Sequence, residues 1–272
     1  MSEKPLVVIP TYLRKSPELM LTGKCLRTLR ETIGDRADVL VVDDGSPARD
    51  LVEGGLQGTC ELYDAELVVK SENEGFSRTV NVGLQRALDE GRDAILVNND
   101  VEFGLTKDWL TLMQSQQRSD GKYPASIVGA LLLYPNGLIQ HGGIFFSLLR
   151  REFDHRFRFG PGNLPEAQHA VPCPVTGALM FIRHECLEGV GLYDESFRLG
   201  WEDVSYCIDT VLAGRECVYQ PGVRAIHHES FTRGQGGDAK IQQWTEYSWL
   251  RFCAKHANTN FASFVPTTMS MR

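Results

Sequence analysis

The 272-residue sequence lacks several features that would place a protein in a specialised class. No stretch approaches the roughly 20 consecutive apolar residues that a membrane-spanning helix needs. The first residues contain neither the apolar run nor the cleavage site of a signal peptide, so we expect a cytoplasmic protein, in the cytosol or at the inner face of a membrane. The seven cysteines include no Cys-x-x-Cys pair, which predicts reduced, mostly buried thiols rather than disulfides or a zinc ribbon.

An excess of basic residues is also missing. The 28 Lys and Arg residues against 35 Asp and Glu give a formal net charge of −7, which disfavours nucleic acid as the main partner because phosphate backbones attract basic surfaces. The remaining composition is that of an ordinary globular protein. The length is near the upper limit for one hydrophobic core and predicts either one large domain or two halves around a cleft.

Strand-like and helix-like segments alternate through the first hundred residues. The spacing of apolar residues predicts helices over 19–33 and 77–90. Short apolar runs predict buried strands at 6–9, 39–42, 67–69 and 94–97. This order predicts right-handed βαβ units, and therefore an α/β fold with a mostly parallel, Rossmann-like central sheet flanked by helices.

A polar cluster follows each of these predicted strands. The clusters are Pro10-Thr11-Tyr12, Asp43-Asp44-Gly45-Ser46, Asn73-Glu74-Gly75-Phe76 and Asn98-Asn99-Asp100. Ligands of parallel sheets bind where the carboxyl ends of the strands meet, so the four clusters predict one shared pocket. The alternative is that polar turn residues simply follow every strand.

The alternation of strand-like and helix-like segments ends beyond residue 100. Further strands are expected at 127–133, 138–146 and 175–182, and 151–174 is rich in Gly and Pro without a clear period. We expect this last stretch to be a long loop over the cleft. An amphipathic helix from 204 ends before Gly214, with Glu202 and Asp203 at its start.

Two clusters have the chemistry of a metal site and a base. Asn98, Asn99 and Asp100 provide hard oxygen ligands suited to Mg²⁺ or Mn²⁺ beside a diphosphate, unless they only form a turn. His227 or His228 could complete the metal shell, or either could be an ordinary surface or core histidine. The carboxylates at the helix start could take a proton from a hydroxyl, or could simply cap the helix.

In their order along the chain, the polar clusters resemble the donor-binding half of glycosyltransferase family 2. Motifs in the second half resemble the rhamnosyltransferase-like branch of that family, and the resemblance runs from about residue 5 to residue 234. These motifs are Tyr134-Pro-Asn-Gly137, Gln140-His-Gly-Gly143, Val175-Thr-Gly-Ala178, Val190-Gly-Leu-Tyr-Asp-Glu195, Trp201-Glu-Asp203 and His227-His-Glu-Ser230.

The resemblance implies a GT-A fold in a single domain with two functional halves. Residues 1–100 would bind the donor, 101–237 would form the acceptor and catalytic half, and 238–272 would be a helical extension. The implied reaction is the inverting transfer of a sugar from a UDP- or dTDP-linked donor to a hydroxyl of a glycan, a lipid-linked sugar or another acceptor.

The resemblance also implies roles for individual residues. Asp203, with Glu202 beside it, would be the catalytic base, and Asp100 with His227, or its rival His228, would hold Mn²⁺ or Mg²⁺. Asn98 replaces the first carboxylate of the family's Asp-x-Asp motif. The residues implied to bind the donor are Pro10, Thr11, Tyr12, Asp43, Asp44, Asn73, Gly75, Asn81, Asn98 and Asn99. Those implied to line the sugar pocket are His141, Thr176, Gly177 and Trp201.

Two rival functions follow from the same fold. A nucleotidyltransferase would open with a Gly-rich phosphate loop, which Ile9-Pro-Thr-Tyr-Leu-Arg14 is not. A non-catalytic protein that binds nucleotide sugars or glycans would need neither a base nor a full metal shell. The aromatic helix expected over 240–255 should pack on the main domain, with a homodimer contact or a peripheral membrane contact as alternatives.

Overall fold

The computed structural model describes residues 4–229 and 239–264. The strands are β1 (Leu6–Thr11), β2 (Asp38–Asp43), β3 (Glu66–Val69), β4 (Ala94–Val97), β5 (Val101–Glu102), β6 (Ile127–Leu133), β7 (Ile139–His141), β8 (Ile144–Ser147), β9 (Glu152–His155), β10 (Val171–Pro172), β11 (Leu179–Ile182) and β12 (Cys217–His227). The helices are α1 (Ser16–Ile33), α2 (Gln57–Leu62), α3 (Phe76–Asp89), α4 (Trp109–Ser115), α5 (His184–Val190), α6 (Glu202–Leu212) and α7 (Ala239–Lys255). Short irregular helices cover Leu51–Leu56, Pro165–Ala167 and Phe261–Phe264.

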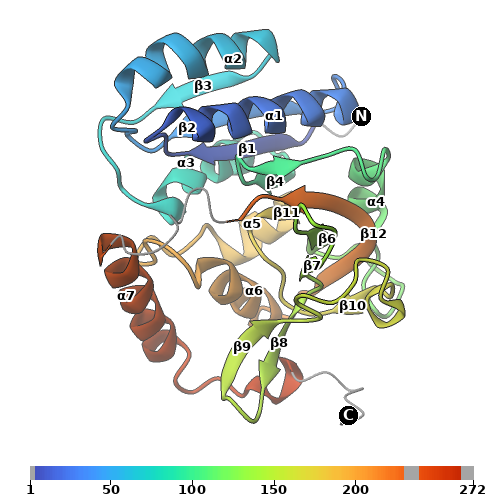
Figure 1. The fold of residues 1–272 in the computed structure, drawn as a ribbon. Coiled ribbons are helices and arrows are strands. Elements are labelled where there is room, and N and C mark those ends of the chain that lie inside the picture. Colours follow the sequence, from blue (N-terminus) through green and yellow to red (C-terminus); the bar gives the residue numbers. More distant parts are fainter. Residues whose placement is uncertain (1–3, 230–238, 265–272) are drawn as a thin grey trace.

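One continuous sheet joins both halves of the chain (Figure 1). Its order is β10-β12-β6-β11-β4-β1-β2-β3, with β5 beside β12 and β7 beside β6. The strands β4, β1, β2 and β3 are parallel, while β11 is antiparallel to both β4 and β6 and connects the halves. The predicted α/β fold with a central sheet between helices is confirmed. The division of the chain into a donor half and an acceptor half at residue 100 stays a prediction. The predicted end of the acceptor half at residue 237 lies outside the described residues.

The two faces of the sheet carry separate apolar cores because side chains alternate along a strand. In β1, Val7 and Ile9 pack on the side of α1 and α4, whereas Leu6 and Val8 pack on the side of α3 and α5. The helix α3 approaches β1 very closely, since a Cβ atom on Gly83 would lie 2.4 Å from Val8 Cγ2. This packing fixes the loops at the carboxyl ends of the strands, where polar residues gather.

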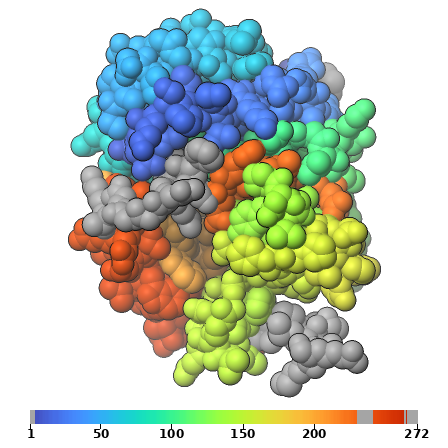
Figure 2. All heavy atoms as spheres, in the orientation of Figure 1, coloured from blue at the N-terminus to red at the C-terminus, as the bar shows by residue number. Residues whose placement is uncertain are grey.

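Two expectations for the second half were wrong. The stretch 151–174 is not a plain loop, because it contains β9, a short 3₁₀ helix and β10. The strand expected over 138–146 is interrupted at Gly142 and Gly143, which separate β7 from β8. Nothing in the local pattern indicated the β8–β9 hairpin, whose apolar residues Phe146 and Phe153 pack on Phe261 of the C-terminal segment. The hairpin projects from the end of the molecule opposite the N-terminal half (Figure 2).

The C-terminal helix α7 packs against the main domain, as expected. Phe252 joins an apolar cluster with Val204 and Ile208 of α6. Polar contacts reinforce this packing, since Ser205 Oγ lies 2.9 Å from His256 Nε2 and Lys255 forms an ion pair of 2.7 Å with Asp209. Residue 238 and residues 265–272 of the predicted extension lie outside the described residues. None of the helices that the structure describes is both long and apolar enough to cross a bilayer.

The cysteines are free thiols, as predicted, and most of them are buried. Burial raises the pKa of Cys173 to about 12 and that of Cys186 to about 11. Because the thiolate is the reactive form, these side chains act as packing groups.

Candidate active site

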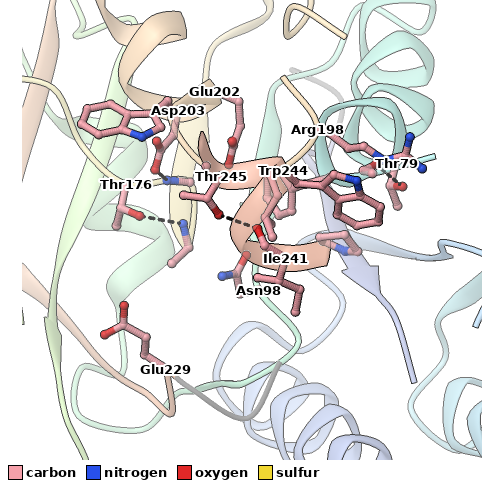
Figure 3. Close-up of a pocket in the computed structure, with 18 of the residues that line it drawn as sticks. Thr79, Asn98, Thr176, Arg198, Glu202, Asp203, Glu229, Ile241, Trp244 and Thr245 are labelled. Atoms are coloured by element: carbon pink, nitrogen blue, oxygen red, sulfur yellow. Dashed lines mark hydrogen bonds between the residues drawn. The ribbon is translucent and has the colours of Figure 1, made fainter. Parts of the chain in front are cut away.

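A pocket of about 510 Å³ opens at the carboxyl ends of the strands β1, β2 and β4. The volume is in the range that holds a small-molecule ligand. Most residues predicted for the site line this pocket, and Figure 3 shows several of them converging from different elements. They are Pro10, Thr11, Tyr12, Asp44, Asn73, Gly75, Asn98, Asn99, Asp100, Thr176, Gly177, Trp201, Glu202, Asp203 and His227.

On the donor side of the pocket, Asp44 holds the loop that precedes α3. Its Oδ1 atom accepts hydrogen bonds from Lys70 Nζ at 2.7 Å and from the amide of Glu74 at 3.0 Å, and its Oδ2 atom accepts one from the amide of Gly75 at 2.9 Å. The carboxylate is buried, so these charge-assisted bonds are strong. Asp44 therefore fixes the wall of the pocket besides lining it.

Arg198 is a pocket residue that lies between the sequence motifs and was not among the predicted site residues. Its Nη2 atom donates to the carbonyl of Asn73 at 2.8 Å, and its guanidinium lies 4.3 Å from the ring centroid of Trp244. The backbone of Gly75 approaches Arg198 closely, with a φ of +98° that favours glycine. Arg198 thus joins three segments that are far apart in the sequence and places a positive charge in the pocket.

Asp100 and His227 meet because β5 pairs with the end of β12, where His227 is opposite Val101. His227 Nε2 lies 3.1 Å from Asp100 Oδ1 and 3.4 Å from Asn98 Nδ2. On the other side of the ring, His227 Nδ1 lies 2.9 Å from Gln140 Oε1. An amide oxygen can only accept, so His227 Nδ1 carries a proton and donates to Gln140, and Nε2 is the ring nitrogen that faces Asp100.

The charge of Asp100 is well defined. Burial acts to raise the pKa of this carboxyl, but the neighbouring His227 outweighs burial and keeps the pKa below its usual value. Asp100 is therefore ionised at neutral pH. Its Oδ1 atom and the Oδ1 atom of Asn98 are both buried, and neither has a hydrogen-bond partner among the described residues.

This arrangement fits a divalent cation. Two buried oxygen atoms that lack hydrogen-bond partners among the described residues, together with an imidazole nitrogen, are the ligand types that Mn²⁺ and Mg²⁺ accept. Within residues 4–229 and 239–264, no three His, Cys, Asp or Glu side chains cluster closely enough to hold a metal by themselves. Asp100, Asn98 and His227 can therefore hold a cation only in part, and the remaining ligands would have to come from a bound phosphate or water.

Four predicted residues do not line the pocket. Side chains alternate along a strand, so His228 points away from His227 and lies 3.0 Å from Glu102. Asp43 is wholly buried and bonds the backbone amide of Ser46 at 3.0 Å. Asn81 bonds the backbone of Tyr193 at both ends of its amide. These three residues stabilise loops behind the pocket, and the geometry offers them no contact with a ligand.

His141 is the fourth residue outside the pocket. It is fully buried behind the pocket wall and lies against His155, a residue that does line the pocket. The hairpin register, which pairs His155 with Ile144, brings it back beside His141.

Asp203 lies in the first turn of α6 and faces the pocket (Figure 3). Its Oδ2 atom accepts a hydrogen bond from the amide of Gly177 at 3.0 Å, and its Oδ1 atom accepts one from Val204 at 2.8 Å. Each oxygen keeps a further lone pair, so the carboxylate can still accept a proton.

Residues of α7 form another wall of the pocket. Ile241, Trp244 and Thr245 line it, and Trp201 packs against Trp249 with ring centroids 4.6 Å apart and the ring planes tilted by 47°. The aromatic content of this helix was visible in the sequence, but its place over the pocket was not. Only tertiary packing brings α7 to the ends of the strands.

The chain matches the family model described as Glycosyl transferase family 2 over residues 6–131. It is 30% identical over 217 residues to the uncharacterized protein y4gI of Sinorhizobium fredii, covering 76% of this chain and 23% of that protein. It is 29% identical over 172 residues to the O-antigen biosynthesis protein RfbC of Myxococcus xanthus, covering 59% and 13%. The chain therefore spans less than a quarter of these relatives' lengths.

A solved structure shows the same fold. The crystal structure of GalNAc-T7 with UDP, GalNAc and Mn²⁺ superposes with a TM-score of 0.67 at 16% identity, over 92% of this chain and 47% of that chain. The fold and the family match agree with the order of motifs in the sequence, whereas the rhamnosyltransferase-like branch stays a prediction. Residues 6–131 thus belong to glycosyltransferase family 2, and the chain has the GT-A fold.

Proposed function

We propose that this protein is an inverting glycosyltransferase that moves a sugar from a UDP- or dTDP-linked donor to a hydroxyl of an acceptor. The observation that carries the proposal is that Asp203 and the Asp100–His227 pair face one pocket. An inverting transfer needs a base for the acceptor hydroxyl and positive charge near the departing diphosphate. The pocket has a carboxylate for the first task and a partial cation site for the second.

The charges that line the pocket support a cation. The carboxylates are Asp44, Asp100, Asp154, Glu202, Asp203 and Glu229, and the guanidinium groups are Arg14 and Arg198. A diphosphate would meet repulsion from this excess of negative charge. Bound Mn²⁺ or Mg²⁺ on Asp100, His227 and Asn98 would supply the compensating charge, and the solved structure of GalNAc-T7 contains Mn²⁺.

Asp203 performs the proton transfer. Its carboxylate takes the proton of the acceptor hydroxyl as the acceptor oxygen forms a bond to the anomeric carbon. The bond between that carbon and the diphosphate oxygen breaks, and the nucleoside diphosphate leaves with the electron pair. The hydrogen bonds from Gly177 and Val204 hold Asp203 in place, so the base is oriented before the substrate arrives.

The donor would occupy the side of the pocket formed by the loops after β1, β2 and β4, and the acceptor the side formed by α6 and the β8–β9 hairpin. This division follows the proposed halves, 1–100 and 101–237. The relative RfbC is described as an O-antigen biosynthesis protein, which favours a glycan or a lipid-linked sugar as the acceptor. The motif resemblance favours a UDP- or dTDP-linked hexose or deoxyhexose as the donor.

The test uses the full chain with UDP-, dTDP- and GDP-sugars, each with Mn²⁺, with Mg²⁺ and with chelator. We expect UDP or dTDP with metal to stabilise the protein by about 2.7 kcal/mol at 100 times the Kd, which raises the melting temperature. Released nucleotide should appear from the matching sugar nucleotide, and NMR of the product should show an inverted anomeric centre. Nucleotide binding without any release would favour a binding protein, and no nucleotide binding would refute the proposal.

A further inference from the structure

Two histidines share a hydrogen bond at the wall of the pocket. His141 Nδ1 and His155 Nδ1 lie 2.8 Å apart, and the two rings meet at 81°. His141 is fully buried, whereas His155 lines the pocket. Of two neutral imidazoles joined in this way, one must carry its proton on Nδ1 and donate, and the other must accept.

The fold brings the pair together through two glycines. A Cβ atom on Gly142 would lie 3.0 Å from Phe157 Cδ2, and one on Gly143 would lie 2.6 Å from Cys173 Sγ. Gly143 also has a φ of +91°. Glycine at these positions lets the chain turn sharply from β7 into β8, so that the end of β9 returns beside His141.

The surroundings of His141 decide which ring donates. Its Nε2 atom is buried and has no hydrogen-bond partner among the described residues. A buried N–H group without an acceptor is rare and costly, so the proton of His141 is on Nδ1 and Nε2 is bare. His155 Nδ1 then accepts the hydrogen bond, and His155 must carry its own proton on Nε2.

Both rings stay neutral at neutral pH, which this assignment requires. Burial lowers the pKa of His141 well below its usual value, and it lowers the pKa of His155 as well. The negative charge of Asp203, which lines the same pocket, acts against the effect of burial at His155. Among the described residues, no group forms a hydrogen bond with His155 Nε2. This atom is also not fully buried, and His155 lines the pocket, so its N–H is open to the pocket.

We propose that His155 is an acceptor-binding residue whose Nε2–H donates a hydrogen bond to the acceptor beside Asp203, and that His141 is the residue that positions it. The inference rests on the proposed function and specifies the acceptor as a sugar residue. A sugar presents a second oxygen next to the attacked hydroxyl, which matches an N–H donor next to a base. The aromatic face of Trp201, fixed by Trp249, offers the apolar wall that a sugar ring also needs.

The tautomers can be measured without any substrate. Protein labelled with ¹⁵N at histidine and recorded at neutral pH should show His141 protonated at Nδ1 and His155 protonated at Nε2, with assignments from His141→Gln and His155→Gln. A His155 ring protonated at Nδ1 would overturn the inference, because no donor would then face the pocket.

Acceptor binding is tested with methyl glycosides of common hexoses and deoxyhexoses, added to protein saturated with UDP or dTDP and Mn²⁺. His155→Phe should weaken glycoside binding about tenfold, the effect of one lost hydrogen bond, while nucleotide affinity is retained. His155→Gln, whose amide nitrogen can take the place of Nε2, should recover part of the binding. His169→Phe, which removes an exposed histidine, is the control.

Other results of these binding experiments would contradict the inference. Equal glycoside binding by His155→Phe and the unchanged protein would overturn the role of His155. Nucleotide binding without any glycoside binding would overturn the sugar acceptor. If the proposed function is wrong, the result differs from these outcomes. The unchanged protein would then release no nucleotide from any sugar nucleotide, even if glycoside binding still depended on His155.

Discussion

The Oδ2 atom of Asp203 lies 3.0 Å from the amide of Gly177, a contact between the start of α6 and the loop before β11. This bond and the one from Val204 orient the carboxylate in the pocket. Asp203→Asn keeps the size of the side chain and removes its basicity. We expect initial transfer rates to fall by about 100- to 10,000-fold, as is typical when a positioned base is lost. Calorimetry should show nearly unchanged nucleotide affinity.

A control separates chemistry from folding in that experiment. In Asp203→Asn, the new side-chain amide can accept from only one of the two backbone groups, which should cost about 1 kcal/mol in urea unfolding. Glu188→Gln removes a carboxylate from the exposed face of α5 and should change neither rate nor affinity. Parallel losses of nucleotide binding and stability in Asp203→Asn would instead give Asp203 a structural role.

Asp100 should determine how metal affects nucleotide binding. Among the described residues, Asp100 is the only carboxylate that contacts His227 Nε2, and Asp100→Ala removes it. We expect Mn²⁺ to strengthen UDP or dTDP binding in the unchanged protein and to have little effect in the variant. Electron paramagnetic resonance of Mn²⁺ with calorimetry measures both. Because the protein supplies only part of the ligand shell, Mn²⁺ alone should bind weakly.

Two further variants test the geometry of that site. Glu102→Gln changes the partner of His228 outside the pocket and should leave the Mn²⁺ titration unchanged. Gln140→Leu removes the acceptor that holds His227 Nδ1, and loss of such an outer partner typically weakens metal binding about 10- to 100-fold. An effect of Glu102→Gln as large as that of Asp100→Ala would point to His228 as the ligand.

Gly75 should be intolerant of any side chain. A Cβ atom there would lie 2.7 Å from the carbonyl oxygen of Arg198, and the φ of +98° disfavours other residues. We expect Gly75→Ala to lower the free energy of unfolding by about 2 to 3 kcal/mol and to weaken nucleotide binding. Gly91→Ala is the matched control, because Gly91 has a φ of +70° with open space around it. It should cost only about 1 kcal/mol.

Stability should fall as the pH drops below neutral. Burial lowers the pKa of His256, which bonds Ser205, and of His141 and His155. The unfolded chain therefore binds protons below about pH 6.5 that the folded protein does not accept. Each such histidine costs up to about 1.4 kcal/mol per pH unit, between pH 6.5 and its lowered folded pKa.

Urea unfolding at pH 7.5 and pH 5.5 measures this loss. His256→Gln keeps a hydrogen-bonding side chain opposite Ser205. It should reduce the pH dependence of the free energy of unfolding by the contribution of one histidine. His169→Gln, which changes an exposed histidine, should leave the slope as it is. A slope unaffected by His256→Gln would show that α7 docks independently of the protonation of His256.

The family could be identified from local pattern, and the reason is physical. Buried strands such as β1 and β4 have continuous apolar runs, and the residues directly after them must lie at the same edge of a parallel sheet. Asp44, Asn73 and Asp100 could therefore be assigned to one pocket without coordinates, because chain direction alone determines where they lie. The start of α6 was equally predictable from helix periodicity, and so was the position of Asp203 in the first turn of that helix.

Contacts between distant segments could not be predicted in this way. Nothing in the sequence near Arg198 or Trp244 indicates that these two side chains stack on each other in the wall of the pocket, since α7 reaches the pocket only through packing on α6. Likewise, the motif around Gln140 suggested His141 as a pocket residue. The hairpin instead places His155 in the pocket and leaves His141 behind it.

The sequence by itself thus determined the α/β class, the family and the edge of the sheet where the chemistry lies, because these depend on periodicity and chain direction. The tertiary structure decided which side chain of each motif reaches the pocket. His227 rather than His228 faces Asp100 because side chains alternate along a strand, and only the pairing of β5 with β12 sets the phase of that alternation. Register is a property of two segments together, so neither segment's sequence contains it.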